Sequence, residues 1–377
     1  MSHHDKMHWE GDAWIASEIE SAGGVVTFAR FMELALYAPG HGFYEREKRG
    51  PGREGDFYTS VSVGPLFGEL LAWRMASWLK PLLQAGQDGR WPVMIVEAGA
   101  HDGRLAADIL QWFKLNQPAM LGLIRYAIIE PSENRRHWQQ KRLQEFEGRV
   151  QWIESPAKLP QLRGVIFSNE LLDAFPVHRL GWDAGRKEWF EWGVGWNEHA
   201  VWRRMEPALD LKSSLAWPRW PAEVLGVLPD GFSLEISPSA ADWWAAVAGC
   251  LRQGRLMTMD YGFYWEELMR PERAGGTLRA YFHHAISSDI LAYPGFQDLT
   301  AHVNFSVLQE VGEKAGLKTE GLVSQESFLM GIIAEIEAGC GGGEYWTSER
   351  RRQLQTLVHP VHLGRSFRVL IQRRDGG

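Results

Sequence analysis

The chain has 377 residues and a formal net charge of −7, from 40 Lys and Arg against 47 Asp and Glu, which argues against a general nucleic-acid binder. A composition of 45% hydrophobic and 23% charged residues is that of a globular protein with one large domain or two. The chain has only two cysteines, its N-terminus lacks the apolar core of a signal peptide, and no apolar run approaches the ~20 residues of a membrane helix. These features predict a cytoplasmic protein with no membrane partner.

Residues 1–88 are expected to form an N-terminal helical segment with a long loop. Apolar positions predict one helix over 11–36 and another from Leu66 to Leu83. The intervening residues 37–65 are rich in Gly and Pro, and loops of this length are usually functional or disordered. Their aromatic content favours an ordered loop.

Strands and helices alternate through residues 89–176. Short apolar runs predict strands at 93–98, 125–130, 150–153 and 164–168, with helices over 103–115 and 132–146 between them. The alternation resumes with a helix at 239–252 and a strand at 255–260, and it closes with helices at 304–315 and 348–357 and a strand at 367–372. This pattern predicts a parallel sheet with helices on both faces, built from 89–176 and 236–377.

Two segments interrupt that pattern. Residues 177–235 alternate in polarity and predict an antiparallel insertion, while residues 262–303 form a second, irregular insertion. The first insertion holds several of the 19 tryptophans, namely Trp182, Trp189, Trp192, Trp196, Trp202, Trp217 and Trp220. We interpret them as packing on strands, and a platform for a partner or substrate is the alternative.

A parallel sheet binds ligands at the carboxyl ends of its strands. The first such end carries Glu97, followed by Gly99 and Gly103 before a helix, a turn that can present backbone N–H groups to a cofactor. The spacing is not the full dinucleotide fingerprint, so a tight turn without a ligand is the alternative.

The next two strand ends also carry polar residues. Glu130 is placed to bind ribose hydroxyls, or alternatively to cap the helix that begins after Ser132. Asn169, Glu170 and Asp173 follow the strand at 164–168 and are expected to face the same cleft, unless they form an ordinary polar loop.

These motifs lie within a longer resemblance. The chain resembles the MidA-type family of S-adenosylmethionine-dependent methyltransferases, whose eukaryotic members are mitochondrial. The matching segments are YAPGHGFY at 37–44, GDFYTS at 55–60, LFGELLA at 66–72, VEAGAHDGRLAADIL at 96–110, IIEPS at 128–132, NELLDAFPVHRL at 169–180, DYG at 260–262, GTLRAY at 276–281, PGFQDLTAHVNF at 294–305, SQESFL at 324–329 and SFRVL at 366–370. They cover nearly the whole chain, and NELLDAFPV and QDLTAHVNF are the most specific.

The resemblance implies a class I methyltransferase with a Rossmann-like sheet, S-adenosyl-L-methionine as cofactor and a protein arginine as acceptor, in the family an arginine of a respiratory complex I subunit. Glu170 and Asp173 would then orient the guanidinium, although Asp173 could instead cap the following turn.

The resemblance also assigns two binding segments. Gly55, Asp56 and Thr59 would belong to a loop that covers the cofactor, with a solvated turn as the alternative. Gln297, Asp298 and Thr300 would line the substrate mouth. His283-His284 and His359-x-x-His362 lack the accompanying residues of a metal motif, so no metal site is expected.

Two departures from the family pattern concern activity. Ala100-His101-Asp102 stand inside a loop that is glycine-rich in the family, and Val61-Ser62 stand where the family has a Pro-Glu pair. A cofactor-binding assembly factor without catalysis is therefore an alternative, and a nucleotide-dependent dehydrogenase is a further one. The sequence leaves open the target protein, the number of methyl groups added and the oligomeric state.

Overall fold

The computed structural model describes residues 13–46, 59–84, 91–282, 285–340, 346–359, 363–364 and 367–376. The chain forms two compact units. The sheet unit comprises Arg49–Leu171, Trp243–Gly262 and Gln309–Gly377, and the insertion unit comprises Met1–Lys48, Leu172–Asp242 and Phe263–Leu308. The expected N-terminal segment 1–88 is thus divided between the units, and the irregular segment after 262 groups with the antiparallel insertion rather than with the sheet.

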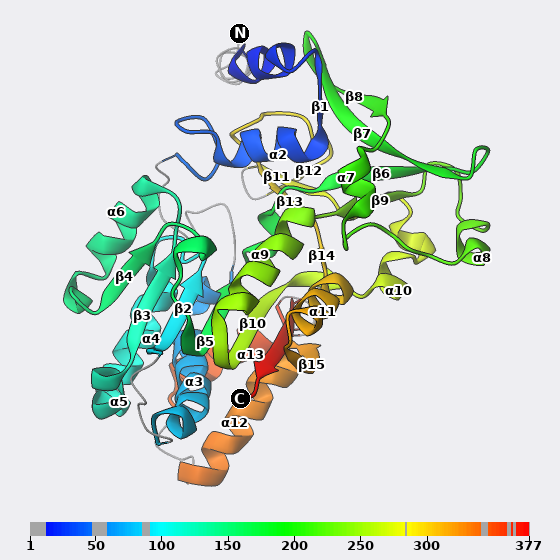
Figure 1. Cartoon of the computed structure of the whole chain (residues 1–377). Coiled ribbons are helices and arrows are strands. Elements are labelled where there is room, and N and C mark those ends of the chain that lie inside the picture. The colour runs from blue at the N-terminus through cyan, green and yellow to red at the C-terminus, as the bar shows by residue number, and fades with distance from the viewer. Residues whose placement is uncertain are drawn as a thin grey trace. The chain divides into compact units, whose positions relative to one another are not determined.

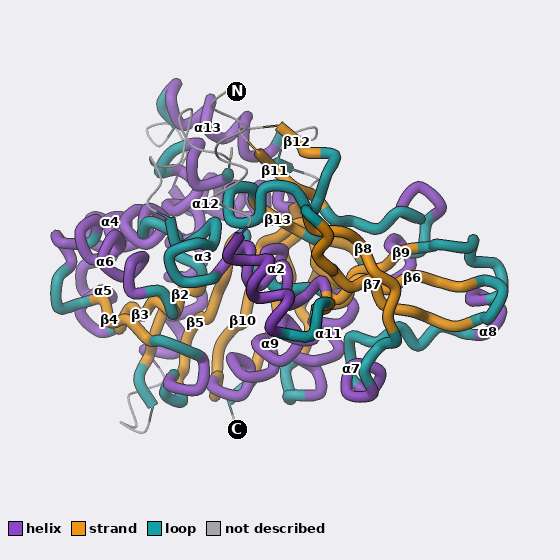
Figure 2. Tube along the Cα trace, turned by 90° about the horizontal axis from the view of Figure 1, so that it is seen from above, coloured by secondary structure: helices purple, strands orange, loops and turns teal. Residues whose placement is uncertain are grey.

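The sheet unit is built on a mixed sheet with the strand order β15-β16-β10-β5-β2-β3-β4. Figure 2 shows the part of it from β10 through β5, β2 and β3 to β4. Its strands are β2 (Val93–Ala98), β3 (Arg125–Ile129), β4 (Val150–Ile153), β5 (Leu162–Asn169), β10 (Leu251–Phe263), β15 (Lys318–Ser324) and β16 (Phe367–Arg374). Strands β4, β3, β2, β5 and β10 are parallel, and β16 is antiparallel to both β10 and β15. The chain reverses direction across the sheet between β2 and β5, the point at which such folds bind ligands. The Rossmann-like fold expected from the sequence is confirmed.

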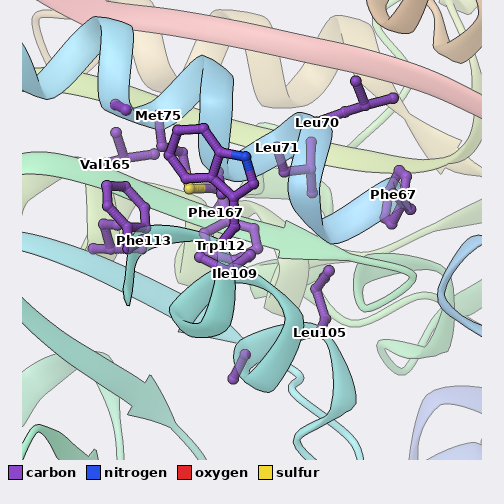
Figure 3. Packing of buried hydrophobic residues seen from close by; sticks show 14 of the residues in the cluster. Phe67, Leu70, Leu71, Met75, Leu105, Ile109, Trp112, Phe113, Val165 and Phe167 are labelled. Atoms are coloured by element: carbon purple, nitrogen blue, oxygen red, sulfur yellow. The ribbon is translucent and has the colours of Figure 1, made fainter. Parts of the chain in front are cut away.

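Helices cover this sheet (Figure 1). They are α3 (Leu66–Gln84), α4 (Arg104–Asn116), α5 (Pro118–Leu123), α6 (Glu133–Arg142), α9 (Pro238–Cys250), α11 (Phe305–Lys314), α12 (Gln325–Cys340) and α13 (Ser348–Val358). Within the sheet unit, Leu71 of α3 and Ile109 of α4 pack with Phe167 of β5 (Figure 3), and all three are fully buried. Burial of each such side chain stabilises the fold by roughly 1.5–3 kcal/mol. Trp244 of α9 belongs to the sheet unit, where its Nε1 donates to Gln372 Oε1 of β16 at 2.8 Å.

The insertion unit carries the predicted antiparallel sheet, with the order β1-β7-β6-β9 and β8 paired to β7. Its elements are a helix over 13–21, β1 (Val25–Thr27), α2 (Phe28–Tyr37), β6 (His178–Asp183), β7 (Glu188–Asn197), β8 (His199–Met205), α7 (Leu209–Ser213), α8 (Ala222–Leu225), β9 (Ser233–Ile236), α10 (Trp265–Leu268) and β14 (Val303–Asn304). A second sheet has the order β12-β11-β13, from β11 (Arg279–Phe282), β12 (Ala285–Ser287) and β13 (Asp298–Thr300).

The tryptophans of the insertion pack mainly against one another. The Trp182 and Trp189 rings meet edge to face with centroids 5.1 Å apart, and Trp220 meets Trp189 at 5.8 Å. Trp182 and Trp189 are buried, and none of the other five named tryptophans is fully exposed. The packing interpretation is therefore confirmed for this cluster.

The single helix predicted over 11–36 is wrong. Gly23 and Gly24 adopt positive φ angles of 96° and 89°, which end the first helix before β1 begins. Thr27 then caps α2, because its side chain accepts a hydrogen bond from the Arg30 N–H. Across the described ranges, no helix is long and apolar enough to cross a membrane.

Candidate active site

The glycine turn after β2 needs residues that tolerate left-handed backbone. Gly99 and Gly103 have φ angles of 74° and 83°, and His101 between them has 48°. A Cβ on Gly99 would lie 2.9 Å from Leu171 Cδ1, so a side chain there also meets a steric obstacle. Gly103 is the N-cap of α4 and has no side chain to occupy that helix terminus. Asp102 Oδ1 accepts from the Arg104 N–H at 3.1 Å, so the turn leaves only the other N–H groups of this helix N-terminus to an acceptor group of a ligand.

Glu97 lies in β2 just before this turn and is buried. The Tyr126 hydroxyl donates a 2.6 Å hydrogen bond to Glu97 Oε2. Burial raises the pKa of Glu97 to about 8, the Tyr126 hydrogen bond opposes that rise, and the negative charges of Asp102 and Asp108 add to it. A cationic ligand group beside this carboxyl would restore its charge.

Glu130 follows the end of β3 and is buried. Its Oε1 accepts from the Ser132 N–H at 3.1 Å, and its Oε2 accepts from Gln139 Nε2 at 3.0 Å. The capping role considered from the sequence is thus present. Each carboxylate oxygen can accept more than one hydrogen bond, so capping is compatible with a contact to ribose, which stays a prediction.

Asn169 ends β5 and Glu170 follows it, beside β10. Met259 of β10 is in register with Asn169, and the Glu170 N–H donates to the Met259 carbonyl at 2.9 Å. Asp260 is fully buried at the next position, where it accepts from the N–H groups of Leu171 at 3.2 Å and Tyr261 at 2.9 Å. Glu170, just past β5, and Asp260 of β10 therefore place two carboxyl groups side by side where β5 ends.

The two carboxyl groups have different environments. Glu170 has a left-handed φ of 50°, and its Oε1 accepts from Asn169 Nδ2 at 3.1 Å. The residue keeps part of its surface exposed, but its carboxyl group is withdrawn from water. This desolvation raises the pKa of Glu170 to about 8, with a further rise from Asp260, while hydrogen bonds from Asn169 and the Ser60 backbone oppose it. The Asp260 carboxyl group, by contrast, has a backbone N–H donor on each of its oxygens.

The turn that reaches Glu170 is a short helix, η1 (Ser60–Val63). Thr59 Oγ1 accepts from the Ser62 N–H at 3.2 Å, and Ser62 Oγ accepts from the Thr59 N–H at 3.0 Å. This is a capping box, in which the third helical position is usually Glu or Gln. Ser62 thus performs the capping that a glutamate at this position would perform, and the departure from the family pattern preserves the turn.

The insertion unit holds the remaining predicted residues. Tyr44 donates a 3.1 Å hydrogen bond to Asp298 Oδ2, and Asp298 is in register with Tyr281 across β11 and β13. Burial raises the pKa of the Tyr281 hydroxyl, Arg279 opposes the rise, and the charges of Asp173 and Asp298 add to it. Asp173 and Asp298 therefore lie close enough to the same hydroxyl to influence it.

Gln297 and Thr300 flank Asp298. Gln297 is buried, and its Nε2 donates to the carbonyls of Asp289 at 3.2 Å and Ile290 at 2.9 Å, which fixes the preceding loop. Thr300 ends β13 in register with Arg279. The acceptor contacts expected for these residues stay predictions.

The sheet unit brings together Thr59, Glu97, Gly99, Gly103, Glu130, Asn169 and Glu170, at or beyond the carboxyl ends of its strands. Asp173, Gln297, Asp298 and Thr300 belong to the insertion unit. Gly55 and Asp56 lie outside the described residues. Sequence reasoning missed the site roles of Asp260 and Gln139, although the acidic end of the strand RLMTMD was a signal for the first.

One orphaned group shows that the site suits a polar cofactor. Asn169 is 8% exposed, and its Oδ1 has no hydrogen-bond partner among the described residues. A buried acceptor without a donor is unfavourable by about 1–3 kcal/mol, which a donor on a ligand would relieve. Together with the glycine turn and Glu130, it fits the amino and hydroxyl donors of S-adenosylmethionine. Within the described ranges, no three His, Cys, Asp or Glu side chains are grouped to hold a metal ion.

Comparison with known families agrees with this geometry. The model of the S-adenosyl-L-methionine-dependent methyltransferase family Methyltransf_28 matches residues 74–323. The chain belongs to this MidA-type methyltransferase family. Its cofactor is S-adenosyl-L-methionine.

Similar proteins are known over nearly the full length. A Burkholderia thailandensis protein solved with bound S-adenosyl-homocysteine is 30% identical, with a TM-score of 0.80 over 98% of this chain and 93% of its own. The mouse mitochondrial protein arginine methyltransferase NDUFAF7 is 27% identical over 94% of this chain and 83% of its own. The homolog from Drosophila melanogaster is 26% identical over 83% and 72%.

Proposed function

We propose that this MidA-type methyltransferase methylates an arginine side chain of a protein. The mouse and fruit-fly relatives are named protein arginine methyltransferases, and they align with most of the chain. The observation that carries the proposal is the pair of carboxyl groups of Glu170 and Asp260, which lie where β5 ends beside the parallel strand β10. A guanidinium is always charged, and carboxylates in this arrangement can accept hydrogen bonds from its planar fork.

S-adenosylmethionine supplies an electrophilic methyl group on a positively charged sulfur. Glu170 would accept a hydrogen bond from the guanidinium and direct one nitrogen at that methyl group, so that orientation rather than a covalent enzyme intermediate lowers the barrier. That nitrogen forms the new N–C bond while the S–C bond breaks. It then loses a proton, and the Glu170 carboxylate is a suitable acceptor because its pKa is raised.

Asp260 would act mainly through its fixed charge. Both of its carboxylate oxygens accept backbone N–H groups, so it holds one position and keeps a negative field beside Glu170. That field favours the binding of a cationic acceptor over a neutral one. Asp173, Asp298 and Thr300 of the insertion unit are proposed to bind the acceptor protein, and a reducing, cytoplasmic location is proposed on the cysteine content.

The test is methyl transfer from labelled S-adenosylmethionine to proteins of a cell extract, with the modified residue located by mass spectrometry. Methylated arginine in the presence of the parent, and its loss with Glu170→Gln, is the expected result. Label on another residue type would refute the arginine assignment. Cofactor binding without transfer to any protein would instead favour a non-catalytic assembly factor.

A further inference from the structure

Gln139 of α6 connects the two parts of the cofactor site. It is fully buried, and its Nε2 donates to the His101 carbonyl at 3.0 Å and to Glu130 Oε2 at 3.0 Å. Its Oε1 accepts from Trp152 Nε1 of β4 at 2.9 Å. One amide therefore uses both of its N–H groups and its oxygen, which fixes its orientation.

A second residue on the same helix holds the neighbouring carbonyl. Arg142 Nε donates to the Asp102 carbonyl at 3.0 Å, and its Nη2 contacts Asp102 Oδ2 at 2.7 Å. Gln139 and Arg142 are three positions apart, so they share one face of α6. Two consecutive carbonyls of the glycine turn, those of His101 and Asp102, are thus held from α6.

This arrangement accounts for the departure from a glycine-rich turn. His101 has a left-handed φ of 48°, a conformation that a residue with a Cβ adopts only at a cost. The hydrogen bond from Gln139 to the His101 carbonyl and the two contacts from Arg142 to Asp102 offset that cost. The same Gln139 amide fixes Glu130, the carboxylate predicted to meet the ribose.

We infer that Gln139 and Arg142 form a clamp that sets the distance between the glycine turn and Glu130. Gln139 is the positioning residue of this clamp, and through that distance it makes the site selective for a ribose with both hydroxyls. The inference rests on cofactor binding at this site. Gln139 reaches the cofactor only through Glu130 and the His101 carbonyl. Its removal therefore weakens the recognition of the sugar more than that of the rest of the ligand.

The experiment measures binding of S-adenosylhomocysteine and of its 2′-deoxy analogue by calorimetry. The parent is expected to prefer the ribose form roughly tenfold, the value of one good hydrogen bond. Gln139→Met keeps the side-chain length but loses all three hydrogen bonds. It should lower the affinity for S-adenosylhomocysteine about 10- to 100-fold and reduce the preference to within about twofold.

Gln140→Met is the matched control, because Gln140 is the exposed neighbour on the same helix. It should leave both affinities unchanged. Gln139→Glu gives a second readout that a folding defect would not produce. The new carboxyl faces Glu130, with the Arg142–Asp102 pair beside it, and restores a donor only when protonated. Relative to the parent at each pH, its affinity for S-adenosylhomocysteine should rise as the pH falls from 8 to 5.5, because Glu97 and Glu170 titrate in both proteins and cancel in that ratio.

The outcomes separate this inference from the proposed function. A parent that does not bind S-adenosylhomocysteine overturns both. A parent that binds it, with Gln139→Met retaining the full affinity and the full ribose preference, overturns the clamp alone. Equal losses for the two ligands, together with a pH profile in Gln139→Glu that parallels that of the parent, would mean that Gln139 only supports folding, and this also overturns the inference.

Discussion

Replacing Glu170 with glutamine tests the acceptor site through its pH dependence. The pKa of about 8 means that only about 1% of the free enzyme has an ionised Glu170 at pH 6. If the ionised carboxylate orients the guanidinium, kcat/KM should rise about tenfold per pH unit below 8 and level off above it. Glu170→Gln removes that slope and lowers the rate at pH 8.5 on the order of 10²-fold, because the acceptor loses its orientation.

The same carboxyl group also affects stability. Its folded pKa lies above the unfolded value of 4.5, so the folded state binds the extra proton between these two pH values. Its contribution to the free energy of unfolding therefore falls by about 1.4 kcal/mol per pH unit as the pH rises from 5 towards 8. Glu170→Gln should become increasingly stable relative to the parent across that window, as measured by urea unfolding at each pH.

Glu147→Gln is a suitable control for both measurements, since Glu147 is exposed in the same unit. It should keep the pH–rate slope and the pH dependence of stability of the parent. An unchanged slope of kcat/KM in Glu170→Gln would refute the acceptor role. Equal loss of S-adenosylmethionine affinity and activity would place Glu170 in the cofactor site instead.

The remaining predictions concern the turns and the insertion unit. Gly99→Val should abolish S-adenosylmethionine binding in calorimetry because its side chain meets Leu171. Gly148→Val is the control, because Gly148 has a φ of 77° and nothing lies within 4 Å of a new Cβ there. It should bind S-adenosylmethionine normally despite a similar backbone strain. Ser62→Ala should lower the free energy of unfolding by about 1 kcal/mol and reduce kcat. Ser62→Glu should preserve both, since a serine or a glutamate side chain can complete the capping box. Equal stability of all three proteins in chemical unfolding would contradict the capping role. Asp298→Asn should raise KM for the protein acceptor without changing cofactor affinity, and an unchanged KM would remove it from the acceptor site.

The elements that follow regular patterns were predictable. The strands at 93–98 and 150–153 have the expected bounds, because short apolar runs beside glycine turns have few other stable arrangements. The pair Gly23-Gly24 was the signal that should have ended the first predicted helix. Strand β15 and helix α12 were not predicted, although the run Phe328–Ile336 includes several buried apolar residues.

The candidate site was predictable only where polar residues directly follow a strand. Glu97, Glu130 and Glu170 satisfy that condition, and the structure places them at or beyond the carboxyl ends of neighbouring strands. Gln139 lies in the middle of a polar helix, so only tertiary structure shows that it contacts Glu130. The pairing of Glu170 with Asp260 depends on β10 lying next to β5, which the sequence does not show for two residues 90 positions apart.

Calorimetric titration of the parent with S-adenosylmethionine, and separately with NAD, tests the central claim most directly. The glycine turn, the orphaned Asn169 oxygen and the Glu130 carboxylate predict saturable binding of one S-adenosylmethionine per chain and no binding of NAD. Asn169→Leu, which removes the orphaned acceptor, should weaken S-adenosylmethionine binding about tenfold. Saturable binding of NAD, or no binding of S-adenosylmethionine by the folded parent, would contradict the account.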